Sequence, residues 1–445
     1  MTSIRDAAAQ VPGYDPDNLR VSDAQAFLRH FAPPAPLATE RVALLQALDR
    51  VLAQDLVSPI DVPAHDNAAM DGYAFAGAQL RAGAPLTLTP LAGTALAGTP
   101  WRTPVAPGQC LRTMTGAMLA PGTDTVVPLE LTQPAPDGRI TIAADALAPG
   151  AHRRPRGEDL AHGATALARG ERLTPAALGL VASLGMDHVT VLRRLRVALL
   201  STGSEILQPG AAPRPGAVYD SNRHALHGLL QRLGAQVLDL GAVPDDPALL
   251  RAAFTRGATE ADVLITSGGA SVGDADHTHA LMRELADAAF WHLAMRPGRP
   301  LVVGKLHAEI SSKSASSAQQ TSDSSYQRES ILFGLPGNPV AAVTTFITLV
   351  RPALLRRMGC TCCAPPPLRA ASTGLLRKKP GRTEYLRGIV RQGPDGHPQV
   401  AAAGHQGSGV LSSMARANGL IVLHHDQGDV PPGDLVDVLM FDGAT

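Results

Sequence analysis

Three acidic residues follow predicted strands in one region of this 445-residue sequence, each where the chain leaves the strand. Glu205 and Asp245 follow the first two apolar runs, and Asp276 ends a glycine-rich segment after the third. Carboxylates beside backbone N–H groups suit a phosphate ligand bridged by Mg²⁺, which prefers oxygen ligands. We predict that these acids converge on a nucleotide and Mg²⁺; the alternative for each is a helix cap or a surface acid.

Glycine-rich and basic turns lie at neighbouring strand ends. Glycines let a backbone approach a ligand closely, and two arginines flanking a Pro-Gly turn suit an oxyanion. The alternative for the basic turn is a solvated loop. The candidates are Ser267, Gly268 and Gly269 after the third strand, Arg296, Arg299 and Pro300 at the basic turn, and Pro336, Gly337 and Asn338 before a helix.

Other motifs argue against several classes of enzyme. The sequence has no Gly-x-Ser-x-Gly elbow and no Gly-x-x-x-x-Gly-Lys-Ser/Thr loop, which disfavours a hydrolase triad and a P-loop nucleotide site. Cys360 and Cys363 form one C-x-x-C pair without a second pair, so we predict no zinc or iron–sulfur centre.

The elements that position these residues alternate between residues 195 and 358. Short apolar runs are separated by amphipathic helical stretches, which predicts a doubly wound, mainly parallel sheet with ligands at the carboxyl ends of its strands. The pattern from residue 21 to 55 predicts two helices separated by prolines. Short strand-like pieces predict a small inserted β domain on this helical body, and the last region predicts a C-terminal β-barrel.

We therefore divide the chain into four parts. The helical body comprises residues 1–58 and 154–192, the inserted β domain 59–153, the α/β domain 193–362, and the C-terminal barrel 363–445. A Ser-rich stretch at 310–330 has the composition of a mobile loop rather than of a core.

Composition excludes several partners. Lys+Arg and Asp+Glu are balanced at 39 each, so no overall charge attracts nucleic acid or an anionic membrane. The longest apolar stretch, 340–355, contains threonines and an arginine, and is predicted to be a buried helix. Four cysteines and no apolar N-terminal run predict a cytoplasmic protein.

Eight short segments occur in the order of a known family, between about residues 20 and 440. They are residues 70–74, 112–117, 154–160, 201–205, 219–223, 267–276, 335–340 and 405–409. Each is weak alone, but the ordered series resembles the molybdopterin molybdenumtransferase family, the MoeA-type enzymes related to the gephyrin E domain.

The resemblance implies a reaction and an assembly. Adenylylated molybdopterin and molybdate would be converted to molybdenum cofactor and AMP with the assistance of Mg²⁺. The enzyme would be a homodimer, with each site formed between the α/β domain of one subunit and the β domain of the other. Two alternatives stay open: a molybdopterin adenylyltransferase, and a scaffold of the same fold that has lost turnover.

The resemblance also assigns roles to residues. Glu205, Asp245 and Asp276 would handle the nucleotide and the metal, with Asp276 cleaving the pyrophosphate link by positioning Mg²⁺ or water. The other subunit would contribute Asp71, Thr115, Arg154 and Asp159. Molybdate or the pterin phosphate would be held by Arg296, Arg299, Arg387 and Ser408.

Some positions depart from the family pattern. Arg296, Arg299 and His292 stand where the family usually has lysines, which changes donor geometry and, for His292, the charge near neutral pH. Ser204 replaces a common acid, and Ala341 replaces a common serine.

Overall fold

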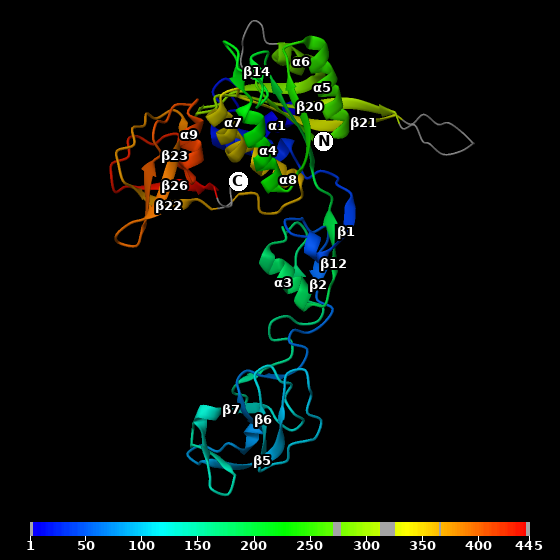
Figure 1. Ribbon diagram of the computed structural model, residues 1–445, viewed down its shortest axis with the longest axis vertical. Coiled ribbons are helices and arrows are strands. Elements are labelled where there is room, and N and C mark those ends of the chain that lie inside the picture. Colours follow the sequence, from blue (N-terminus) through cyan, green and yellow to red (C-terminus); the bar gives the residue numbers. More distant parts are fainter. Residues whose placement is uncertain (1–2, 270–276, 312–324, 365, 442–445) are drawn as a thin grey trace, which may run out of the picture.

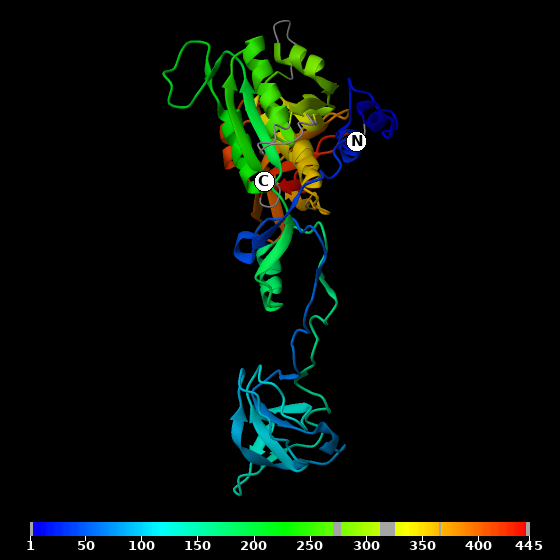
Figure 2. The same cartoon turned by 90° about the vertical axis from the view of Figure 1, so that its right-hand side faces the viewer.

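The computed structural model describes residues 3–269, 277–311, 325–364 and 366–441, which form an elongated molecule (Figures 1 and 2). An α/β domain and a β-barrel lie together at one end, and a separate β domain lies at the other. The predicted fold class is confirmed, whereas the exact domain boundaries stay a prediction. Asp276 and most of the Ser-rich stretch at 310–330 lie outside the described residues.

A six-stranded sheet forms the centre of the α/β domain. Its order is β16, β13, β17, β21, β20, β18; the first four strands are parallel, and β20 is antiparallel to both of its neighbours, β21 and β18. The strands are β13 (Arg196–Thr202), β16 (Gln236–Val243), β17 (Val263–Ser267), β18 (Ala286–His292), β20 (Pro300–Ser311) and β21 (Ser325–Leu335). Between them lie β14 (Ile206–Leu207), β15 (Val218–Tyr219), α4 (Ser221–Leu233), α5 (Pro247–Glu260) and α6 (His277–Leu285).

Local sequence explains these elements. Every residue of β17 is buried, which is why the strand has no exposed polar side: three apolar residues are followed by the small residues Thr266 and Ser267. Helix α4 begins after its N-cap Asp220 and ends at Gly234, whose φ of 88° is left-handed. Helix α5 begins after the N-cap Asp246, with Pro247 in its first turn. The parallel order then brings the strand ends to one edge of the sheet.

A long helical run covers this sheet. It consists of α7 (Pro339–Thr345), the π-helical turn η4 (Phe346–Val350) and α8 (Arg351–Arg357). The run is long and apolar enough to cross a membrane, but 83% of its apolar window is buried inside the protein. The prediction of a buried core helix is confirmed.

The N-terminal region differs in part from its prediction. Helices α1 (Ile4–Ala9) and α2 (Val21–Phe31) pack on the α/β core, where the rings of Phe27 and Trp291 meet edge to face at 4.9 Å. The second predicted helix is wrong. The chain instead forms β1 (Thr39–Ala43), antiparallel to β12 (His188–Leu192), and a 3-10 turn η1 (Leu44–Gln46). Leu45 is 94% exposed, so the apolar spacing there does not mark a buried face.

The slender middle part and the β domain contain short elements. Beside β1 and β12 lie α3 (Pro175–Ser183), β2 (Leu56–Val57) and β11 (Thr165–Leu167). The β domain has a sheet in the order β7, β4, β6, β5, β9, β8. Its elements are β4 (Gly72–Phe75), η2 (Gly77–Gln79), β5 (Leu86–Ala95), β6 (Gln109–Thr113), β7 (Thr125–Pro128), η3 (Leu129–Leu131), β8 (Thr132–Pro134) and β9 (Ile140–Ile142), with the pair β3 (Asn67–Ala68) and β10 (Arg153–Arg154) beside them.

The C-terminal barrel closes on itself and is docked on the α/β domain. Strand β23 pairs with both β24 and β25, which completes a ring of five strands. Tyr385, Met414 and Leu420 belong to the same buried cluster as Val340 of α7. The elements are β22 (Leu368–Ser372), β23 (Thr383–Gln392), β24 (Pro398–Ala402), α9 (Leu411–Arg416), β25 (Gly419–Leu423) and β26 (Leu435–Met440), and β19 (Met295–Arg296) adds to β23.

Candidate functional site

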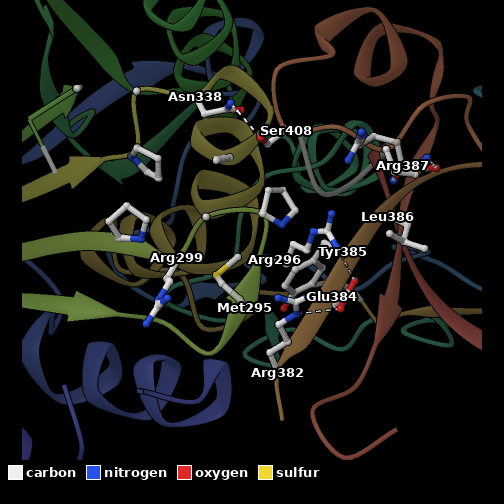
Figure 3. A pocket seen from close by; sticks show the side chains of 18 of the residues that line it. Met295, Arg296, Arg299, Asn338, Arg382, Glu384, Tyr385, Leu386, Arg387 and Ser408 are labelled. Atoms are coloured by element: carbon white, nitrogen blue, oxygen red, sulfur yellow. Dashed lines mark hydrogen bonds and ion pairs between the residues drawn. The ribbon is translucent and has the colours of Figure 1, made fainter. Parts of the chain in front are cut away.

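A cavity of about 1200 Å³ is formed by the carboxyl ends of the parallel strands and by the facing part of the barrel (Figure 3). Its walls come from the strand-end loops, the turn before β20, strand β23 and the loop at 405–409. The predicted site residues that line it are Glu205, Asp245, Gly268, Gly269, Arg296, Arg299, Pro300, Pro336, Gly337, Asn338, Arg387 and Ser408.

Glu205 and Asp245 form the acidic side of the cavity. The backbone N–H of Ser204 donates to Asp245 Oδ2 at 3.0 Å, and the N–H of Asp245 donates to Ser204 Oγ at 3.1 Å. Ser204, which departs from the family pattern, therefore holds Asp245 in place. The cap of α5 is the neighbouring Asp246, which leaves the Asp245 carboxylate on the cavity wall.

Glycine-containing loops form the wall beside these acids. Gly268 has a φ of 100°, and an added Cβ would lie 2.7 Å from the carbonyl oxygen of Thr202, so the loop requires glycine. Ser267 lies behind the wall. Asn222 Nδ2 donates to Ser267 Oγ at 2.7 Å and to the carbonyl oxygen of Gly337 at 2.8 Å, which ties the two loops together.

The acidic side supplies too few ligands to hold a metal ion by itself, but it suits an ion that is also bound by a nucleotide. Asp276 lies outside the described residues, and within those residues no group of three or more His, Cys, Asp or Glu side chains is placed to hold a metal. Glu205 and Asp245 nevertheless supply two carboxylates to one wall. Mg²⁺ is commonly held by one or two carboxylates plus phosphate oxygens, so this donor set fits Mg²⁺ that arrives with a nucleotide.

The basic turn places its two arginines differently. Arg296 turns toward the barrel, where one of its terminal nitrogens lies 4.0 Å from Glu384 Oε2, whereas Arg299 points away from Arg296 (Figure 3). An added Cβ at Gly298, between them, would lie 2.4 Å from Thr345 Oγ1, so the turn packs directly on α7. The two guanidinium groups therefore face different parts of the wall.

His292 lies away from the cavity. Its Nδ1 is 3.5 Å from Asp17 Oδ1, in the segment between α1 and α2. Its backbone also pairs with that segment, because its N–H donates to the carbonyl oxygen of Pro16 at 2.7 Å. His292 therefore contributes to packing against the N-terminal segment, and it is not among the residues that line the cavity.

Arg387 is a buried cation on the barrel side. It is 1% exposed, and its Nε donates to Ser413 Oγ at 3.0 Å. A terminal nitrogen donates to the carbonyl oxygens of His405 and Gly407 at 3.1 and 2.9 Å. Burial lowers the pKa of Arg387, and the nearby Arg296 lowers it further. A buried guanidinium bonded to neutral acceptors favours an anion in the adjoining cavity.

The loop held by Arg387 reaches across to the α/β domain. Asn338 Nδ2 donates to Ser408 Oγ at 3.1 Å (Figure 3), and the backbone N–H of Val340 donates to the carbonyl oxygen of Ser408 at 3.2 Å. Ser408 therefore joins the barrel to the start of α7 at the cavity wall.

Sequence reasoning missed three charged residues of the barrel wall, Arg377, Arg382 and Glu384. Arg382 Nε donates to Glu384 Oε1 at 2.9 Å. A usable signal was present, because two opposite charges two residues apart at the start of an apolar strand share one face. Beside them, burial raises the pKa of Tyr385 above its usual range.

Four other predicted residues belong to the β domain and its connection and do not line this cavity. They are Asp71, Thr115, Arg154 and Asp159. Figure 1 shows the β domain at the opposite end of the molecule from the α/β domain and the barrel. Asp71 Oδ1 accepts hydrogen bonds from the backbone N–H and the hydroxyl of Thr115, each at 2.7 Å, and these bonds lower the pKa of Asp71. Arg154 Nε donates to Glu158 Oε2 at 2.9 Å. One chain therefore does not bring these residues to its own cavity.

Comparison with known proteins accounts for this architecture. Three family models match in order: the MoeA N-terminal region (domain I and II) at 19–185, a probable molybdopterin binding domain at 198–356, and the MoeA C-terminal region (domain IV) at 369–441. The chain is 37% identical over 410 residues to molybdopterin molybdenumtransferase of Haemophilus influenzae, covering 92% of this chain and 95% of that relative. The chain belongs to the MoeA family.

Other MoeA relatives agree. The chain is 33% identical to molybdopterin molybdenumtransferase 2 of Mycobacterium tuberculosis, over 89% of this chain and 94% of that protein. Two structures of a molybdopterin biosynthesis MoeA protein from Pyrococcus horikoshii give TM-scores of 0.76 at 23% identity and 0.70 at 28% identity. They cover 96% of this chain and 100% and 99% of theirs. The protein is thus an enzyme of molybdenum cofactor biosynthesis, as its motifs led us to expect.

Proposed function

We propose that the protein inserts molybdate into adenylylated molybdopterin, forming molybdenum cofactor and releasing AMP. The polarity of the cavity carries this proposal. Carboxylates and glycine-rich loops line one side, and arginines line the other. A volume of about 1200 Å³ exceeds that of ordinary small-molecule sites, so a nucleotide and an oxyanion can be accommodated together.

The nucleotide is assigned to the acidic side. Gly268 and Gly337 allow the backbone to approach phosphate oxygens closely, because neither carries a side chain. Glu205 and Asp245 would hold Mg²⁺ there, and the bound ion would supply neutralisation of the phosphate charge. Asp276 keeps the role that the family resemblance implies, next to the pyrophosphate link.

Molybdate is assigned to the basic side. A tetrahedral dianion needs several N–H or O–H donors in a site sheltered from water, and Arg296, Arg387 and Ser408 supply such donors. Arginine offers a planar fork of donors, whereas lysine offers a point charge. The arginine at position 296 therefore suits an oxyanion with two exposed oxygens.

We further propose a homodimer in the cytoplasm. Asp71, Thr115, Arg154 and Asp159 of one subunit would complete the cavity of the other, since they lie far from the cavity of their own chain. The four cysteines are free thiols, which suits a reducing compartment.

The test is molybdate-dependent release of AMP from adenylylated molybdopterin by the purified protein, followed by chromatography. We expect Asp245→Asn to slow release on the order of 100-fold, the effect of losing one preorganised charge. Asp246→Asn is the matched control, because asparagine remains a good helix cap and should leave the rate near that of the wild type. AMP release that does not depend on molybdate would reject the proposal.

The shared site has its own test. Asp71→Ala and Asp245→Ala are each expected to be inactive. In mixed dimers one of the two sites would be intact, so exchange of subunits should restore about a quarter of the wild-type activity in an equal mixture. Mixed dimers without activity would show that the two residues do not act in one site.

A further inference from the structure

One carboxylate lies among the arginines of the basic side. Of the acids that line the cavity within the described chain, Glu384 alone comes from the barrel. Its side chain is only 6% exposed, whereas those of Arg296 and Arg382 are 61% and 44% exposed. Glu384 Oε1 accepts from Arg382 Nε at 2.9 Å, and Oε2 lies 4.0 Å from Arg296 (Figure 3). A buried acid thus stands between two largely exposed cations.

Backbone pairing fixes this arrangement. Strand β19 runs parallel to β23 with Arg296 opposite Glu384, and the N–H of Thr383 donates to the carbonyl oxygen of Ala294 at 2.8 Å. The turn that carries Arg296 is therefore attached to the barrel strand that carries Glu384. Any loss of their side-chain contact can leave the backbone contact intact.

The guanidinium groups need such an anchor. Arg296 and Arg387 are close enough to affect each other, since Arg296 lowers the pKa of Arg387. Like charges separate and half-exposed arginines change rotamer unless a fixed partner holds them. An oxyanion is bound best by donors that are already aligned before it arrives.

We propose that Glu384 is a positioning residue, which aims Arg296 and Arg382 at the tetrahedral oxyanion; this deepens the proposed function and rests on it. A competing role is electrostatic. Arg296, Arg382 and Arg387 with Glu384 carry a formal charge of +2, and neutralising Glu384 would raise it to +3. Charge alone therefore predicts tighter binding of a dianion without Glu384, whereas positioning predicts weaker binding.

The experiment compares Glu384→Gln and Glu384→Asp with Asp437→Asn. Asp437 is a barrel carboxylate outside the cavity that also contacts an arginine and a histidine, at 3.3 and 2.8 Å. Calorimetric titration uses sodium molybdate, sodium sulfate and, separately, AMP. We expect Glu384→Gln to weaken molybdate binding about tenfold, the effect of misaligned charge-assisted hydrogen bonds. AMP affinity should stay as in the wild type, and Asp437→Asn should change neither ligand.

Turnover provides a second readout. For Glu384→Gln, the KM for molybdate should rise about tenfold while kcat stays within about twofold, because the donors are misaligned but present. Glu384→Asp keeps the negative charge but has a side chain that is one methylene group shorter. Weaker molybdate binding by this variant would therefore also support positioning, even if Glu384→Gln did not fold.

Several results would overturn the inference. These are tighter or unchanged molybdate binding by Glu384→Gln, unchanged binding by Glu384→Asp, or a parallel loss of AMP affinity. The proposed function fails separately, if the wild type binds molybdate but releases no AMP in response to it.

Discussion

Asp220 is a buried carboxylate at the start of α4, beside the strand ends that carry the acidic side of the cavity. It is 3% exposed. It accepts hydrogen bonds from the backbone N–H of Arg223 at 3.1 Å and from the hydroxyl of Ser201 at 2.9 Å, and it pairs with Arg223 Nε at 2.8 Å. We expect Asp220→Ala to destabilise the α/β domain, because the buried positive charge of Arg223 would lose one of its negatively charged partners.

The size of the loss follows from these contacts. Removing an N-cap side chain costs about 1 kcal/mol, and breaking a buried ion pair costs about 3–5 kcal/mol. Arg223 keeps Asp239 at 2.5 Å and Gln208 at 2.6 Å, so the lower end of that range applies. One carboxylate makes both contacts, so they are not additive, and we expect about 3 kcal/mol. Asp220→Ser keeps a cap acceptor and should lose about 2 kcal/mol.

Urea unfolding followed by tryptophan fluorescence measures this loss. The chain has two tryptophans, with Trp291 in the α/β core and Trp101 between strands of the β domain. A Trp101→Phe background therefore reports on the α/β domain alone. Asp246→Ala is the matched control, because Asp246 is an exposed helix cap of the same domain, and its loss should cost about 1 kcal/mol.

Two outcomes would refute a stabilising role of the buried pair. If Asp220→Ala and Asp246→Ala lowered the free energy of unfolding equally, the buried pair would add nothing to the cap. A loss below about 0.5 kcal/mol for Asp220→Ala, the range of ordinary surface substitutions, would show that Arg223 is held by its other partners.

Two further predictions concern packing and pH. Gly298→Ala should lower the melting temperature and weaken molybdate binding, because Gly298 has a φ of 98° and an added Cβ would lie 2.4 Å from Thr345 Oγ1. Adding Thr345→Ala should recover part of the melting temperature and part of the molybdate affinity. If the double variant recovered neither, the contact between the two residues would not be the cause. Burial raises the pKa of Cys110 to about 12 and of Cys360 to about 11, above the ordinary 9.0, so iodoacetamide near neutral pH should label the exposed Cys362 first, as mass spectrometry can show. Because the pKa of both folded thiols is raised, the stability that these two thiols contribute is fully present below pH 9 and is lost as pH rises from 9 toward 11 to 12, since the unfolded thiols lose their protons first. An unchanged urea midpoint across that window would refute this.

Local patterns were sufficient for much of the site. The strand that precedes Glu205 is recognisable from its apolar run, since β13 is buried almost throughout and has no polar side. The strand that precedes Asp245 is the edge strand β16, whose shorter apolar run includes the exposed Asp239. Parallel order then brings their ends to one edge, and both residues do line one cavity. Of the two helices predicted within residues 21–55, the first is present as α2, whereas the second was wrong. Leu45 is exposed there, because helical spacing alone cannot show whether a face has a partner to pack against.

What the sequence determined by itself was the alternating α/β pattern, the barrel and, through an ordered series of motifs, the family. These depend on neighbours along the chain. Only the tertiary structure decided that Glu384 stands between Arg296 and Arg382, and that Ser204 supports Asp245. It also decided that Asp71 lies far from the cavity of its own chain. The physical reason is that these relations arise from pairing and packing between segments far apart in the sequence, which no local periodicity encodes.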